Sequence, residues 1–252
     1  MNTPASPPGA PDTAVLVPAA GRGERLGVGV PKALAELAGE PLLVHAVRRL
    51  ARSRSVALIV VAAPPHALDD VRDLLKSTVG DVPLTVVAGG SSRQESVAAA
   101  LVAVPVDLPI VLVHDAARPL TPPTLIDEVA AAVRAGHDAV VPALPVVDTI
   151  KRVDTAGTVV DTVDRSALRA VQTPQGFARD TLVAAHKAAG DTACDAACGT
   201  ADQAATDDAA LVERIGVAVH TVPGRTEALK VTTPFDLILA EALLASASGN
   251  AQ

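Results

Sequence analysis

A strand followed by a glycine loop, near the start of the 252-residue chain, most constrains what this sequence can fold into. Residues 14–17 are too few and too β-branched for a helix, so they predict a buried strand. Gly21 and Gly23 follow, and glycine lets a backbone approach a ligand closely and direct its N–H groups at an anion. Arg25 and Lys32 add two full positive charges just beyond the loop. The segment therefore predicts an anion site at the end of a first strand.

Two common glycine motifs do not fit this loop. In a P-loop the lysine comes directly after the glycines, whereas Lys32 stands nine residues after Gly23. A dinucleotide-binding fingerprint needs a glycine where this chain has Leu26. The glycines alone fit a tight strand-to-helix turn equally well, and Arg25 and Lys32 would then be solvated surface cations. Their place beyond a predicted strand favours the anion site.

Apolar stretches that predict strands alternate with helical patterns in the first part of the chain. The expected strands are residues 14–17, 56–62, 84–88, 110–113 and 139–142, and the expected helices are residues 42–51, 65–76, 92–104 and 121–135. Nearly continuous apolar strands predict a parallel sheet with helices on both faces, which is an α/β fold. Ligands of such sheets bind beyond the carboxyl ends of the strands.

The region 145–175 interrupts this alternation. Residues 149–153 and 158–163 have the pattern of β-strands around a turn at 154–157, which predicts a hairpin leaving the main body. An isolated hairpin needs another surface to pack on.

The last part of the chain returns to helical patterns. The expected elements are helices at 180–189, 209–215 and 234–245, a strand at 217–222, and a flexible loop at about 190–205. Thr206 is the expected N-cap of the second of these helices. Cys194 and Cys198 lie in the loop, where a plain loop is favoured over a metal half-site or a redox pair.

Composition limits the classes of partner and the expected location. The formal net charge is −7 and the chain has no Trp or Tyr, which argues against a nucleic-acid partner. No apolar run is long enough for a membrane span, and the cysteine usage suits a reducing cytoplasm. The proline-rich residues 1–13 predict a disordered tail without the features of a signal peptide, followed by a single domain at 14–248.

The glycine loop belongs to a longer pattern, Pro18-Ala19-Ala20-Gly21-x-Gly23-x-Arg25-Leu26 followed by Pro31-Lys32. This pattern resembles the signature of the 2-C-methyl-D-erythritol 4-phosphate cytidylyltransferases. Later motifs agree in order: Gly89-Gly90-x-x-Arg93-x-x-Ser96-Val97, Val113-His114-Asp115-Ala116-Ala117-Arg118-Pro119, Asp148-Thr149-Ile150-Lys151, Thr162-Val163-Asp164-Arg165, Thr173-Pro174-Gln175, Thr206-Asp207-Asp208 and Leu229-Lys230-Val231-Thr232. The resemblance covers roughly residues 14–244.

The resemblance implies a Rossmann-like, three-layer nucleotidyltransferase fold with a mostly parallel sheet and a protruding β-arm at about 145–175. In this family the arm crosses to a second subunit, so a homodimer is expected. The implied reaction transfers CMP from CTP to 2-C-methyl-D-erythritol 4-phosphate and releases pyrophosphate. The attacking phosphate oxygen is already an anion, so no general base is required, and positioning and charge neutralisation become the main tasks.

Residue roles follow from the resemblance. Arg25 and Lys32 are expected to stabilise charge on the α-phosphate and the leaving group, and Arg165 and Lys230 to hold the substrate phosphate. The expected nucleotide-binding residues are Pro18, Ala19, Ala20, Gly21, Gly23, Gly90, Ser91, Ser96, Asp115 and Ala116. The expected residues on the methylerythritol side are Arg118, Asp148, Thr149, Thr206 and Glu227, besides Arg165 and Lys230. Mg²⁺ is expected as the cofactor, held largely by the CTP phosphates, with Asp115 as its candidate protein ligand; a helix-capping acid is the alternative role of Asp115.

The chain departs from the family pattern at Ser91, where an acid is common, and at Glu227, where Asp is common. Three other functions remain open from the sequence: a ribitol 5-phosphate cytidylyltransferase, a sugar-1-phosphate nucleotidyltransferase and a non-catalytic nucleotide-binding subunit. The Pro18-Ala19-Ala20-Gly21 opening favours methylerythritol phosphate over ribitol phosphate. The retention of all four expected cations argues against the non-catalytic reading.

Overall fold

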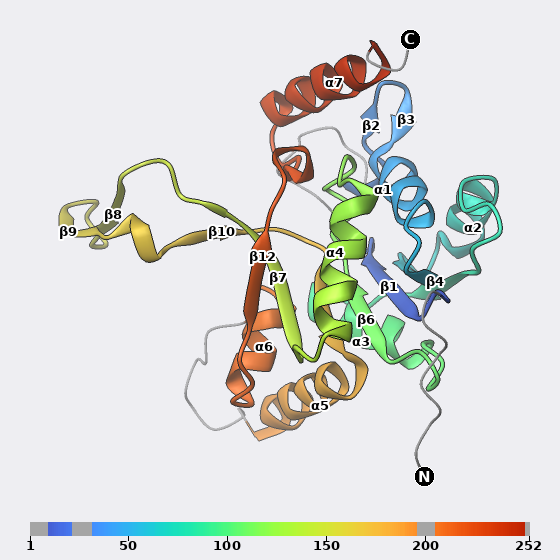
Figure 1. The fold of residues 1–252 in the computed structure, drawn as a ribbon, viewed down its shortest axis with the longest axis horizontal. Coiled ribbons are helices and arrows are strands. Elements are labelled where there is room, and N and C mark those ends of the chain that lie inside the picture. Colours follow the sequence, from blue (N-terminus) through green and yellow to red (C-terminus); the bar gives the residue numbers. More distant parts are fainter. Residues whose placement is uncertain (1–9, 22–31, 196–204, 250–252) are drawn as a thin grey trace.

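The structure is a computed structural model that describes residues 10–21, 32–195 and 205–249. Its centre is an eight-stranded sheet with helices on both faces (Figure 1). The strand order is β10-β7-β11-β6-β1-β4-β5, and β12 pairs with β7. The bounds are β1 Thr13–Pro18, β4 Val56–Ala63, β5 Leu84–Ala88, β6 Ile110–Val113, β7 Ala139–Pro145, β10 Arg169–Val171, β11 Gln175–Ala178 and β12 His220–Pro223. The mostly parallel α/β fold predicted from the sequence is confirmed.

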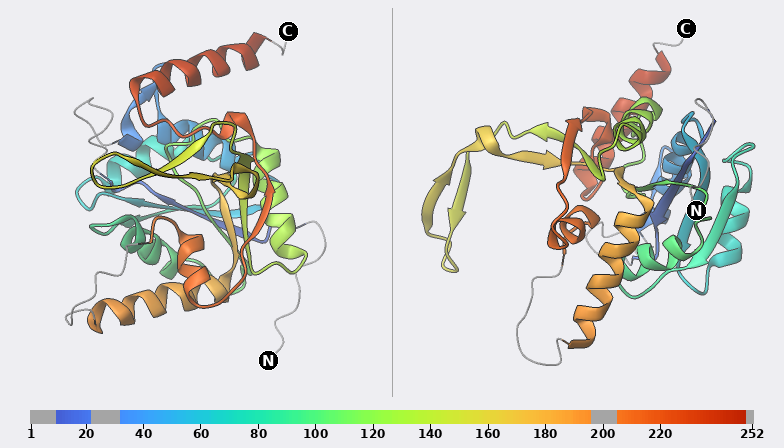
Figure 2. Two further views of the ribbon diagram at one scale, coloured as in Figure 1. Left: turned by 90° about the vertical axis from the view of Figure 1, so that its left-hand side faces the viewer. Right: turned by 60° about the horizontal axis from the view of Figure 1, so that its bottom comes forward.

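The alternation of side chains along β1 explains why both faces of the sheet are covered. Val15 and Val17 point into one core, and Ala14 and Leu16 point into the other. One core includes α1 (Leu42–Ala51), α2 (Leu68–Lys76) and α4 (Pro123–Arg134). The other includes α3 (Arg93–Val102), α5 (Arg179–Asp195) and α6 (Asp208–Arg214). Two views of the ribbon show these layers from the side (Figure 2).

A third, smaller cluster lies beside the main body. Its buried members include Leu37 and Leu42, Leu120, and Ala240 of α7 (Pro234–Gly249). Leu37 belongs to a short ladder formed by β2 (Glu36–Leu37) and β3 (Glu40–Pro41). Among the described helices, none is long and apolar enough to cross a membrane.

Strand β11 was not expected from the sequence, because Gln175-Gly176-Phe177-Ala178 has neither a long apolar run nor many β-branched residues. It lies antiparallel between β6 and β7. A Cβ at Gly176 would come within 2.6 Å of Val129 Cγ1 on α4, so glycine is what lets the helix pack closely on this strand. Tertiary packing, and not the local pattern, therefore determines β11.

Two expectations for the last part of the chain were wrong. Helix α5 continues to Asp195, so residues 190–195 of the expected flexible loop are helical, while residues 196–204, including Cys198, lie outside the described residues. The N-cap of α6 is Asp207 and not Thr206, because Asp207 Oδ1 accepts a hydrogen bond from Ala210 N at 2.9 Å. Thr206 precedes the cap and is exposed.

A hairpin of β8 (Ile150–Val153) and β9 (Val159–Val163) stands away from the sheet (Figure 1). The structure thus has a hairpin at the residues where the sequence pattern predicts one. Val153, Val159 and Val160 on it are 53%, 54% and 58% exposed. Its expected role in dimerisation stays a prediction, as do the expected domain limits. At the other end of the chain, β1 begins at Thr13, and residues 1–9 of the expected tail lie outside the described residues.

Candidate active site

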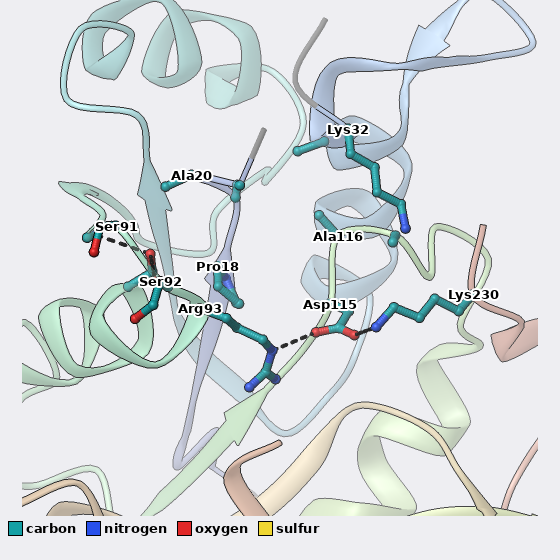
Figure 3. Close-up of a pocket in the computed structure, with 15 residues that line it drawn as sticks. Pro18, Ala20, Lys32, Ser91, Ser92, Arg93, Asp115, Ala116 and Lys230 are labelled. Atoms are coloured by element: carbon teal, nitrogen blue, oxygen red, sulfur yellow. Dashed lines mark hydrogen bonds and ion pairs between the residues drawn. The ribbon is translucent and has the colours of Figure 1, made fainter. Parts of the chain in front are cut away.

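A pocket with a volume of about 280 Å³ lies at the carboxyl end of the parallel strands (Figure 3). Residues 18–21 line it at the end of β1, residues 90–93 after β5, and residues 115–117 after β6. Lys32 comes from a 3-10 turn, η2 (Lys32–Leu34), and Lys230 follows another, η4 (Thr226–Ala228). Parallel strands bring segments that are distant in sequence to one edge, as expected for ligand sites of α/β folds.

Small residues shape the wall between β1 and β5. A Cβ at Gly89 would lie 2.6 Å from Ala20 Cβ, and a Cβ at Gly90 would lie 2.3 Å from Glu95 Cβ. Both positions therefore need glycine for the loop after β5 to pack against its neighbours.

The start of α3 is fixed by a capping box. Ser92 Oγ accepts from Glu95 N at 3.1 Å, and Glu95 Oε2 accepts from Ser92 N and from both Ser91 N and Ser91 Oγ. Ser96 Oγ accepts from Gly90 N at 3.1 Å. The polar wall of the pocket is thus held in place by bonds within the same loop and helix.

Asp115 is the central charged group of the pocket. Its Oδ2 lies 2.7 Å from Lys230 Nζ, and its Oδ1 lies 3.2 Å from Arg93 Nε. Burial alone would raise the pKa of Asp115, but Arg93 and Lys230 outweigh burial and hold the pKa well below its usual range. Asp115 is therefore ionised at neutral pH, and its carboxylate serves these two cations instead of a helix N-terminus.

The backbone beside Asp115 is braced by the Thr173-Pro174-Gln175 segment. Thr173 Oγ1 accepts from Asp115 N at 3.0 Å and lies 3.1 Å from His114 Nδ1. His114 Nε2 lies 3.2 Å from the Arg118 carbonyl oxygen, so the neutral ring donates from Nε2 and accepts the Thr173 hydroxyl at Nδ1. Complete burial lowers the pKa of His114 to about 4, which keeps the ring neutral.

Most of the expected nucleotide-binding residues and two of the expected cations line this pocket. They are Pro18, Ala19, Ala20, Gly21, Lys32, Gly90, Ser91, Ser96, Asp115, Ala116 and Lys230. In Figure 3, Lys32 and Lys230 lie on one side of the pocket, with Ser91 and Ser92 opposite. Gly23 and Arg25 lie outside the described residues.

The expected methylerythritol-side residues other than Lys230 do not line the pocket. Asp148, Thr149 and Arg165 are exposed around the hairpin, and Arg165 Nη1 donates to the Val147 carbonyl. Thr206 and Glu227 are also exposed.

Arg118 was predicted to lie on the methylerythritol side of the site, but it does not line the pocket. Its guanidinium is buried and donates to the Ala228 carbonyl at 2.6 Å and the Val171 carbonyl at 3.2 Å. A planar guanidinium has donors in fixed directions, and these are used to join β10 to the segment before Lys230. In this structure Arg118 braces the backbone and does not face the pocket.

Arg93 is the pocket residue whose role the sequence reading missed. It stands in the Gly89-Gly90-x-x-Arg93 motif, but its contacts with acids that are far away in sequence cannot be read from local spacing. Its side chain is 31% exposed, and its second ion pair extends to Asp208, behind the pocket.

The residues of the pocket fit a magnesium ion only as a partner of bound phosphates. Among the described residues there is no group of three or more His, Cys, Asp and Glu that could hold a metal. Asp115 offers one ionised carboxylate, and Mg²⁺ usually keeps waters and substrate phosphates as its other ligands. The donor set is thus compatible with a nucleotide-borne Mg²⁺.

Comparisons with known proteins agree with this geometry. The family model described as 2-C-methyl-D-erythritol 4-phosphate cytidylyltransferase matches residues 13–246. A protein of that name from Frankia casuarinae is 57% identical over 239 residues, covering 95% of this chain and 84% of the relative. Another from Saccharopolyspora erythraea is 56% identical, covering 91% and 98%.

Solved structures show the same fold. The crystal structure of the cytidylyltransferase of that name from Thermus thermophilus has a TM-score of 0.72 and 37% identity, covering 91% of this chain and 97% of its own. The structure of 4-diphosphocytidyl-2C-methyl-D-erythritol synthase from Anaerococcus prevotii has a TM-score of 0.77 and 26% identity, covering 92% and 98%. The extent of these matches shows that the chain belongs to the 2-C-methyl-D-erythritol 4-phosphate cytidylyltransferase family.

Proposed function

We propose that this protein transfers CMP from CTP to 2-C-methyl-D-erythritol 4-phosphate, forming 4-diphosphocytidyl-2-C-methyl-D-erythritol and pyrophosphate in the non-mevalonate pathway to isoprenoid precursors. The observation that carries the proposal is the convergence of Lys32, Lys230 and the loop at 18–21 on one pocket at the carboxyl edge of the sheet. Family membership identifies the two substrates.

The chemistry needs positioning more than proton transfer. A phosphate oxygen of the acceptor attacks the α-phosphorus of CTP in line with the departing pyrophosphate, and charge builds on the phosphoryl oxygens. Lys32 stabilises that charge at the α-phosphate and the leaving group, in company with Arg25. Lys230 holds the acceptor phosphate. Donors fixed before the reaction stabilise the transition state without having to reorganise during it.

The nucleotide base and ribose bind along the loop at 18–21, with Gly90, Ser96 and Ala116 beside them. Bound Mg²⁺ would neutralise triphosphate charge, and Asp115 is the residue that would contact it. A mostly backbone and small-residue wall suits a flat pyrimidine ring, because carbonyl and amide groups can bond to its polar edge.

The second subunit completes the site in this proposal. Asp148 and Thr149 precede the hairpin and Arg165 follows it, and none of the three lines the pocket of its own chain. All three are exposed, as are the valines of the hairpin. A homodimer that buries these valines would bring Arg165 of the partner subunit to the acceptor phosphate. The protein is proposed to work in the cytoplasm.

The experiment is pyrophosphate release from CTP with two alternative acceptors, methylerythritol phosphate and ribitol 5-phosphate. Release with methylerythritol phosphate, and at least about a hundredfold lower kcat/KM with ribitol phosphate, is expected because the two relatives described above carry the methylerythritol name. A preference for ribitol phosphate would contradict the substrate assignment. No release with either acceptor would contradict the activity itself.

A further inference from the structure

A row of charged side chains, with two buried carboxylates, extends from the pocket to the helices behind it. Arg93 Nη1 lies 2.6 Å from Asp208 Oδ2, and His186 Nε2 lies 2.9 Å from Asp208 Oδ1. The side chains of Asp208 and His186 are 1% and 6% exposed. Asp208 does not line the pocket, yet it is joined to Asp115 through Arg93.

We propose that Asp208 is a positioning residue for the transfer reaction, because it holds Arg93 in the orientation in which Arg93 fixes the Asp115 carboxylate beside Lys230. This inference rests on the proposed function. The order of contacts is His186, Asp208, Arg93, Asp115 and Lys230.

The geometry of Arg93 supports a bridging role. Its Nη1 donates a hydrogen bond to Asp208 and its Nε donates one to Asp115, so the planar guanidinium is clamped between the two carboxylates. A lysine would present a single ammonium group and could not make the same two contacts with the same directions. Loss of the Asp208 charge would remove one of the two contacts that clamp Arg93, and Asp115 would then lose its fixed orientation.

The two arginine and lysine charges in this row of side chains are matched by two carboxylates. Arg93 and Lys230 together match Asp115 and Asp208, and each buried carboxylate has a cationic partner. A buried charge that loses its partner is strongly unfavourable. Removal of one of these charged side chains is therefore expected to change the positions of the others. A change at Asp208 is therefore expected to reach Lys230, although the two residues have no direct contact among the described ion pairs.

Other contacts fix the backbone on which Asp208 stands. Gln175 Nε2 donates to Asp207 Oδ2 at 2.7 Å, and Gln175 Oε1 accepts from Ala209 N at 3.2 Å. The start of α6 is thus attached to β11, and through β11 to the same sheet edge as Asp115. This attachment places the Asp208 carboxylate independently of any ligand.

The test is a double-mutant cycle on transfer kinetics, with Asp208→Asn and Lys230→Ala made singly and together in the full chain. Asp208→Asn keeps the size of the side chain and removes its charge. We expect it to lower kcat about tenfold or more and to raise KM for methylerythritol phosphate more than KM for CTP. The double variant should be no slower than Lys230→Ala alone, because Asp208 acts through Lys230.

A matched control separates positioning from simple destabilisation. Asp12 is also buried and paired with an arginine, since its carboxylate accepts two hydrogen bonds from Arg134, but it stands at the opposite end of β1 from the pocket. Asp12→Asn should lower the melting temperature as Asp208→Asn does and leave both kinetic constants unchanged. The Arg93→Lys variant should retain less than a tenth of the wild-type kcat, because one ammonium group cannot hold both carboxylates.

Three results would overturn the inference. One is an Asp208→Asn enzyme with wild-type kcat and KM at a temperature where it is folded. Another is a full multiplicative loss in the double variant, which would mean that Asp208 and Lys230 act independently. The third is full activity of Arg93→Lys. Failure of the proposed function would appear differently, as absence of activity in the wild-type protein in the same assay.

Discussion

Lys230 and Arg165 are both predicted to hold the acceptor phosphate, yet the chain holds them in different ways. Lys230 lies beside Asp115, which Arg93 also contacts, and that set is anchored in the buried core by Asp208. Arg165 is exposed, and its described hydrogen bond is to Val147, in the segment that leads to the hairpin. The main body thus fixes Lys230 by contacts of its own, and we propose that Arg165 is held at the site only when a second subunit packs against the hairpin.

The largest predicted effect tests whether the site is shared between subunits, and it is measured by mixing inactive subunits. Lys32→Ala and Arg165→Ala should each lower kcat by about 10²–10³, because each removes a donor aimed at phosphate charge. In the proposed dimer, co-expressed subunits with distinct tags should form heterodimers. One of the two sites then combines the intact Lys32 of the Arg165→Ala subunit with the intact Arg165 of the Lys32→Ala subunit. A random mixture should then recover about a quarter of wild-type activity, since about half the dimers are mixed and each has one intact site.

The control pair is Lys32→Ala with Lys230→Ala. Both residues belong to the main body, so every site in that heterodimer lacks one of them and no recovery is expected. Purified Lys32→Ala/Arg165→Ala heterodimers that stay as inactive as their parents would show that the site is not shared between subunits.

A second prediction compares the stability effects of a core residue and a hairpin residue. Leu112 is fully buried in β6, and Leu112→Ala should lower the free energy of unfolding by about 2–5 kcal/mol. Val160 on the hairpin is 58% exposed, and Val160→Ala should change the free energy of unfolding of the monomer by less than about 0.5 kcal/mol. The same Val160 variant should weaken dimerisation, because the valine is proposed to be buried only there.

Chemical denaturation at concentrations below the dimer dissociation constant measures the first effect, and sedimentation equilibrium measures the second. A Val160→Ala monomer as destabilised as Leu112→Ala would mean that the hairpin packs on its own main body. An unchanged dimer dissociation constant would remove Val160 from the interface.

The sequence predicted the parts of this molecule that depend on local pattern. Residues 56–62 are apolar throughout because β4 is buried on both faces, and the expected strand matches it closely. The hairpin strands were predicted from their β-type residues on either side of the turn at 154–157. The glycine loop after the first strand was predicted to be a ligand site from its local pattern, since close backbone approach needs glycine. The Gly89-Gly90 pair came from the family resemblance, and the structure shows that a Cβ at either position would be too close to its neighbours.

What the sequence reading missed depends on contacts between distant residues. Arg93 and Asp208 are separated by 115 positions, so no spacing rule connects them. Arg118 was assigned to the substrate from the family resemblance, but its guanidinium donates to backbone carbonyls of segments far along the chain. Strand β11 likewise depends on distant contacts. It pairs with β6 and β7, and α4 packs so closely on it that only glycine fits at position 176.

The last prediction concerns the pH dependence of stability, and it distinguishes the braced main body from the segment beside the hairpin. Burial lowers the pKa of His114 from 6.5 to about 4, so the unfolded chain binds a proton that the folded protein excludes between these values. Stability from this group is complete above about pH 6.5 and falls as the pH drops towards 4, by up to about 1.4 kcal/mol for each pH unit. Just after the hairpin, hydrogen bonds from Ser166 lower the pKa of Asp164 below 3.8, so any contribution of that group is lost only at more acidic pH.

Urea unfolding between pH 4 and pH 7 tests this difference. His114→Gln cannot take up a proton, so its stability should be lower at pH 7 but should fall less steeply below pH 6.5 than that of the wild type. His66→Gln, at an exposed position after β4, is the matched control and should leave the slope unaltered. Equal slopes for wild type and His114→Gln would mean that protonation of His114 does not oppose folding, and that the Thr173 hydroxyl and the Arg118 carbonyl do not hold the ring in its neutral form.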